Sequence, residues 1–313
     1  MFRQLISKEY CVSNEPTTAA AASLDWARIR VVFTAVAVTI FLASMGQTVV
    51  TTALPIIVGE LGGLSQITWV ITAYLLAATV GAPVFGKLGD LFGRKRVLQC
   101  GIVTFLAGSV LCAVSANIWM LVAGRAVQGF GGGGLIVVSM ATIADVLPAR
   151  QRGRFQGILG SVFGLSTVIG PLVGGFIVEH FDWIWIFLLN LPVGAVVLTI
   201  LSVILEPGET RSDRPSIDFL GAALLAATLS LIVMAASLGG QMVPWSSPLI
   251  AMMIGAAAIA LAAFILAERR AAEPILPLQL FTINNFVVSN SVGFITGVAM
   301  FSSITFVPFF IRG

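Results

Sequence analysis

Apolar blocks of about 20 residues recur along almost the whole chain, and this pattern limits its fold more than any other feature. A block of that length is what an α-helix needs to cross the hydrocarbon layer of a membrane. The blocks are continuously apolar and rich in Gly, Ala, Leu and Val, which favours helices over the alternating strands of a barrel. Only 10% of the residues are charged, against about 25% in a soluble domain. The sequence therefore predicts an all-α polytopic membrane protein.

The blocks predict nine membrane-spanning helices and their orientation. They lie at about 31–54, 69–86, 97–116, 119–142, 155–178, 184–205, 217–239, 248–267 and 285–311. All but two of the 17 Lys and Arg residues precede the first span or follow an even-numbered one. Because Lys and Arg mark the cytoplasmic side, we expect a cytoplasmic N-terminus in a cell (inner or plasma) membrane. Tryptophans at the predicted outer boundaries agree, namely Trp69, Trp119, Trp183, Trp185 and Trp245.

Several other classes of protein are disfavoured. The net charge of +3 comes from short basic clusters between apolar blocks, so we predict no nucleic-acid partner. Cys11, Cys100 and Cys112 lack the spacing of metal ligands, and no metal site or cofactor is predicted. The chain has no zinc-protease motif, nucleophile elbow or phosphate-binding P-loop. We therefore do not expect an enzyme.

The first candidate segment is Gly86–Arg96, between the second and third spans. Its glycines let two helix ends approach closely, and Asp90 can cap the next helix or pair with an arginine such as Arg94. An ion pair at this position is suited to holding one conformer and releasing it in another. The alternative is a plain basic turn.

The second candidate is Arg125 inside the fourth span, with Gln128, Gly129 and Gly132 on the same helix face. An arginine at this depth costs about 2.5–3.5 kcal/mol on insertion scales and normally faces the bundle interior or a water-filled cavity. We predict a role in transport or conformational coupling. The alternative is a structural arginine whose donors bind backbone carbonyls.

The fifth and sixth spans carry the remaining candidates. In the fifth, Gly160/Gly164 and Gly170/Gly174 are pairs that permit tight helix crossing, and Pro171 predicts a kink. Such a helix can rock against its neighbour, or it can form a static packing face. In the sixth, Asn190 is a buried amide suited to bridging helices, and Pro192 predicts a bend. Gln47 in the first span is a further candidate for bridging or for lining a cavity.

Together these segments resemble the major facilitator superfamily, and within it the fourteen-helix drug:proton antiporter branch. The resemblance covers about residues 31–311 and rests on five motifs in the same order as in the family. They are Thr48–Pro55, Gly86–Arg96, Leu121–Gly129, Gly170–Gly175 and Trp185–Pro192.

The resemblance implies a domain organisation. Residues 1–30 would be a cytoplasmic tail, and residues 31–205 would form the N-terminal six-helix bundle. Residues 206–282 would be a linker with two extra membrane helices, and residues 283–313 the first helix of an incomplete second bundle. Five further helices of that bundle are expected by resemblance and are absent from this sequence.

Two positions depart from the family pattern. Gly46 stands where members often have an acidic residue, and no other Asp or Glu lies at mid-membrane depth in the predicted spans. Proton coupling would then have to use Asp90, the region of Arg125, or residues beyond 313. Ser166 stands where the fifth-helix motif more often has glycine.

By resemblance, the function is secondary active export of drug-like or amphipathic small molecules by alternating access, coupled to protons. The expected partners are a small-molecule substrate, protons and the lipid bilayer, and the sequence predicts no oligomeric state. The alternative is a truncated, non-transporting membrane fragment or interaction partner, since the chain ends directly after the ninth block.

Overall fold

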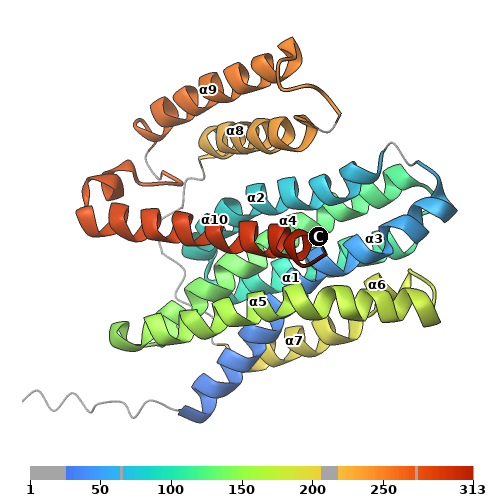
Figure 1. Ribbon diagram of the computed structural model, residues 1–313. Helices are drawn as coiled ribbons and strands as arrows, with labels where there is room; N and C mark the ends of the chain where they lie inside the picture. The colour runs from blue at the N-terminus through green and yellow to red at the C-terminus, as the bar shows by residue number, and fades with distance from the viewer. Residues whose placement is uncertain (1–25, 64–65, 206–217, 241, 272–273, 313) are drawn as a thin grey trace, which may run out of the picture.

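The computed structural model describes residues 26–63, 66–205, 218–240, 242–271 and 274–312. Most of the predicted tail, residues 206–217 of the predicted linker, and Gly313 lie outside the described residues. The described chain is helical almost throughout (Figure 1). Its elements are α1 (Trp26–Leu61), α2 (Ile67–Phe92), α3 (Arg94–Ala113), α4 (Ile118–Val146), α5 (Ala149–His180), α6 (Trp185–Leu188), α7 (Asn190–Ile204), α8 (Phe219–Leu238), α9 (Pro248–Glu268), the 3-10 helix η2 (Leu278–Thr282) and α10 (Asn284–Arg312).

Eight helical segments within the described ranges are long and apolar enough to cross a membrane. They coincide with the first eight predicted spans, with α6 and α7 together forming the sixth, and the predicted all-α membrane class is confirmed. The ninth predicted span lies within α10, where the side chains from residue 300 onward are outside the description.

The packing is centred on α4, which lies between α2 and α3, while α1 contacts α4, α5 and α7. Glycines make the closest approaches possible. A Cβ on Gly129 or Gly133 would overlap backbone atoms of α2 at Tyr74 or Ala78, and one on Gly131 would overlap the backbone of α3 at Phe105. Because only glycine leaves room for these neighbouring backbones, the three helices form one tightly packed unit.

The α1–α5 crossing uses Gly170 and Gly174, whose missing side chains leave space for Thr48 and Thr52 of α1. The Thr48 hydroxyl also donates to the Ser166 carbonyl at 3.2 Å. The other predicted pair differs: a Cβ added to Gly160 or Gly164 would meet no atom of another helix within 4 Å among the described residues, so this pair forms no crossing there.

The sixth span is interrupted at Leu189, between α6 and α7, rather than at Pro192 itself. Proline has no N–H to donate to the carbonyl four residues earlier, so the helix is weakened in the turn that precedes it.

Trp183, predicted to lie at the outer membrane boundary, is only 3% exposed. Its indole N–H donates to Glu60 Oε2 of α1 at 2.7 Å, so the polar group of this tryptophan is satisfied by another part of the protein.

The linker helices form a hairpin in which α8 and α9 pack against each other and α8 packs along α2 (Figure 1). At the opposite end of the bundle from Arg94, Ser237 of α8 borders a cavity with Ile67 and Ile71 of α2. Farther along, Ser230 borders another with Ala77 and Val80. α8 therefore runs antiparallel to α2 along the stretch where the two helices pack.

Candidate functional site

Arg125 of α4 is fully enclosed, with 1% of its surface exposed. Its Nη1 donates to the Gly46 carbonyl of α1 at 2.8 Å and to Gln128 Oε1 at 2.6 Å, and its Nε donates to the Val70 carbonyl of α2 at 3.4 Å. Its partners are thus two carbonyls and an amide, from three helices. Among the described residues no carboxylate pairs with it, so its hydrogen bonds all go to neutral groups.

Tyr74 of α2 completes the surroundings of this charge. The guanidinium carbon lies 4.1 Å from the centre of the tyrosine ring, a cation–π arrangement. The Tyr74 hydroxyl donates to the Ala43 carbonyl of α1 at 2.7 Å, which fixes the ring. The negative electrostatic potential of the ring face therefore stabilises the Arg125 charge in place of an anion.

A chain of hydrogen bonds connects Arg125 of α4 with Asn190 of α7. Gln128 Nε2 donates to Ser109 Oγ of α3 at 2.7 Å, and Asn190 Nδ2 of α7 donates to the same oxygen at 3.2 Å. Ser109 in turn donates to the Phe105 carbonyl at 3.1 Å. The structure thus brings Asn190 into the Arg125 network. Gln47 is half-buried on α1 and has no hydrogen bond within the described part of the chain.

Gly46 accepts from Arg125 through its backbone, and the space beside it is small. A Cβ at this position would lie 3.0 Å from the Phe105 ring and 3.8 Å from Gln128 Nε2. Phe105 therefore occupies the volume that a longer side chain would need. With Phe105 in this place, the bundle has no room for a carboxylate side chain at position 46.

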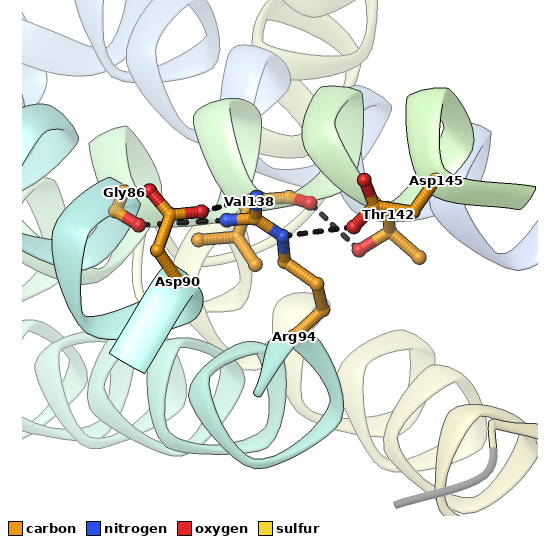
Figure 2. Close-up of polar contacts among 6 residues, drawn as sticks. All are labelled: Gly86, Asp90, Arg94, Val138, Thr142 and Asp145. Carbon is orange, nitrogen blue, oxygen red and sulfur yellow. Dashed lines mark hydrogen bonds and ion pairs between the residues drawn. The ribbon is translucent and has the colours of Figure 1, made fainter. Parts of the chain in front are cut away.

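The second polar cluster lies at the end of the bundle where α2 turns into α3, and Arg94 is its centre (Figure 2). Arg94 forms an ion pair with Asp90 of α2 and a second one, at 3.1 Å through Nε, with Asp145 of α4. Its Nη1 donates to the Gly86 carbonyl at 3.4 Å. We call this group the Arg94 cluster (Gly86, Asp90, Arg94 and Asp145).

The local backbone places Arg94 for these contacts. Gly93 joins α2 to α3 with a φ of 88°, a left-handed conformation that favours glycine. A Cβ on Gly89 would lie 2.8 Å from Arg94 Nη1, so this glycine leaves room for the guanidinium. The Asp90 and Asp145 side chains are more than half exposed. Solvated ion pairs of this kind contribute little individually, about 0–1 kcal/mol, and can open at low cost.

Comparison with protein families assigns the chain: residues 36–313 match the model of the Major Facilitator Superfamily. The chain belongs to the major facilitator superfamily. Members of this superfamily are transporters rather than enzymes, and the chain is accordingly a multi-pass membrane protein of a transporter family.

Two relatives within the superfamily illustrate the similarity. An uncharacterized MFS-type transporter of Mycobacterium tuberculosis is 43% identical over 302 residues, which are 95% of this chain and 44% of the relative. The multidrug transporter protein MdtP of Bacillus subtilis is 40% identical over 280 residues, which are 90% of this chain and 52% of the relative. The chain spans about half the length of the curated relatives it matches.

A solved structure shows the same superfamily fold. The human organic anion transporter MFSD10 (TETRAN) superposes with a TM-score of 0.54 over 72% of this chain and 59% of that chain, at 20% identity.

Three residues of these two clusters were not singled out from the sequence. Asp145 is an acid at the end of an apolar block, and that placement was a signal that could have marked it. Tyr74 and Ser109 lie inside apolar blocks with no distinguishing spacing, and only the helix packing shows that they face Arg125 and Gln128.

Proposed function

We propose that the chain forms the first part of a secondary active exporter of drug-like or amphipathic small molecules, working by alternating access. The observation that carries this proposal is the Arg94 cluster, in which exposed ion pairs join α2, α3 and α4 at one end of the bundle. Ion pairs that open at low cost can hold one access state and release it. The multidrug transporter MdtP among the relatives supports the substrate class, and the match along nearly the whole chain favours this function over a non-transporting fragment.

We further propose the fourteen-helix branch and the domain boundaries predicted above. The α8–α9 hairpin, which follows six spans and packs on α2, supports a linker at 206–282 between a bundle at 31–205 and a segment beginning at 283. The concentration of basic residues near the Arg94 cluster supports its placement in the cytoplasm, with the protein in the cell membrane.

The proposed driving force is an inward proton gradient. No described carboxylate pairs with Arg125, so we assign the coupling role to the carboxylates of the Arg94 cluster, Asp90 and Asp145. Protonation of either would remove an ion pair from Arg94 and favour opening of this end.

The test is efflux by the native gene product at matched expression, with the variant Arg94→Met. Arg96 is an exposed neighbour, so Arg96→Met controls for the loss of a positive charge. We expect Arg94→Met to lower efflux at least about tenfold, because both ion pairs are lost, and Arg96→Met to leave efflux near the wild-type rate. Equal efflux in the two variants would contradict the proposal.

A further inference from the structure

One lysine near the C-terminal end of α2 binds the backbone of the segment that follows α9. Lys87 follows Gly86 of the Arg94 cluster, and its Nζ donates to the Pro274 carbonyl at 3.0 Å. The two residues are 187 positions apart in the chain. We call Pro274, Ile275 and Leu276 the exit segment, because they lead from the linker hairpin toward η2 and α10.

Glu268 holds the same exit segment from the other side. Its Oε1 accepts from the Ile275 N–H at 3.0 Å and from the Leu276 N–H at 3.3 Å. Glu268 is only 4% exposed. Three consecutive backbone groups of the exit segment are therefore bound by two side chains of opposite charge.

The position of Glu268 is unfavourable by local rules. It is the last residue of α9, where the helix dipole disfavours a negative charge, and it is buried. The two backbone N–H groups of the exit segment offset part of these costs. A residue that breaks local preferences and is compensated only by contacts with one segment has the properties of a positioning residue.

We propose that Lys87 and Glu268 are positioning residues that hold the exit segment on the end of α2, so that the linker hairpin moves with the first bundle during transport. Gly86 and Lys87 are adjacent: the carbonyl of one accepts from Arg94, and the side chain of the other binds the exit segment. Opening of the Arg94 cluster therefore displaces the exit segment, and through it η2 and the start of α10. This coupling rests on the proposed transport function, but the binding of the exit segment by Lys87 and Glu268 does not.

The test uses the native gene product with every native cysteine, Cys11, Cys100 and Cys112 among them, replaced by alanine. Spin labels are attached at the exposed positions Arg96→Cys and Gln279→Cys. The distance distribution between the labels reports how firmly η2 is held to the bundle. Lys87→Met and Glu268→Leu remove the donor and the acceptor, and each should broaden the distribution. Lys87→Arg and Glu268→Gln keep a donor and an acceptor, and each should restore most of its sharpness.

The matched control is Lys95→Met. Lys95 donates to the Ser202 carbonyl at 2.6 Å, a lysine–carbonyl bond at the same end of the bundle that does not involve the exit segment. We expect an unchanged distribution in this variant. In efflux assays Lys87→Met should be about fivefold slower than Lys87→Arg, as expected for the loss of a modest coupling energy.

Two results would overturn the proposal: an unchanged distribution in Lys87→Met, or an equal broadening in Lys95→Met. If the label distances respond as expected while the wild-type protein shows no efflux, the binding of the exit segment is supported and the proposed transport function fails.

Discussion

At the scale of single residues, Arg125 shows how a charge is kept inside an apolar bundle. Its planar guanidinium reaches the Gly46 and Val70 carbonyls and the Gln128 amide together. A lysine ammonium cannot reproduce that fork. We therefore expect Arg125→Lys to lower the unfolding temperature in detergent and to abolish most efflux.

Arg125→Leu should be less stable still, because it leaves the buried Gln128 Oε1 without a donor, at about 1–3 kcal/mol. Arg96→Leu at an exposed position is the control for both variants. A stable and active Arg125→Leu protein would show that the network is dispensable.

Gly46 allows a second test at the residue scale. The variant Gly46→Asp places a carboxylate where the Phe105 ring lies 3.0 Å from the new Cβ, so we expect destabilisation by overpacking of about 1–3 kcal/mol. Phe105→Ala removes that obstacle, and the carboxylate can then approach Arg125. The double variant should be more stable than the sum of the two single changes predicts, as measured by thermal unfolding. Simple additivity would mean that Phe105 does not limit this position.

At the scale of helices, the α2–α4 and α3–α4 contacts depend on glycine. We expect Gly133→Ala to impair folding, because its Cβ would overlap the Ala78 backbone of α2, which cannot move without shifting the helix. Gly255 of α9 is the matched control, since it has no neighbour within 4 Å among the described residues. The yield of monodisperse protein should fall sharply for Gly133→Ala and remain normal for Gly255→Ala. Normal yields for both would contradict the close packing of α2 on α4.

At the scale of the whole molecule, the proposed orientation can be tested by labelling. Arg152 lies near the start of α5, and Phe181 lies beyond its far end and is 57% exposed. In a background without native cysteines, a membrane-impermeant maleimide applied to intact cells should label Phe181→Cys and not Arg152→Cys. The reagent should label both after the cells are opened. The reverse pattern in intact cells would place the Arg94 cluster on the outside.

The confirmed predictions concern properties that a short stretch of sequence sets by itself. Hydrophobicity and length suffice to place a membrane helix, so eight of the predicted spans appear among the described helices. The depth of Arg125 in an apolar block also implied that it faces the protein interior, since exposure of that charge to lipid is costly. These conclusions depend on the membrane as a solvent and not on which helix lies beside which.

Sequence alone therefore predicts the membrane-spanning helices and identifies the residue types that must avoid lipid. The partners of the polar residues become visible only in the folded bundle: Asp145 for Arg94, Ser109 for both Gln128 and Asn190, and Pro274 for Lys87. The structure also separates Gly170 and Gly174, which pack against α1, from Gly160 and Gly164, which have the same spacing. Sequence patterns do not predict these contacts, because they join residues far apart in the chain. They depend on how each helix is rotated and translated against its neighbours, and the packing of the whole bundle sets that geometry.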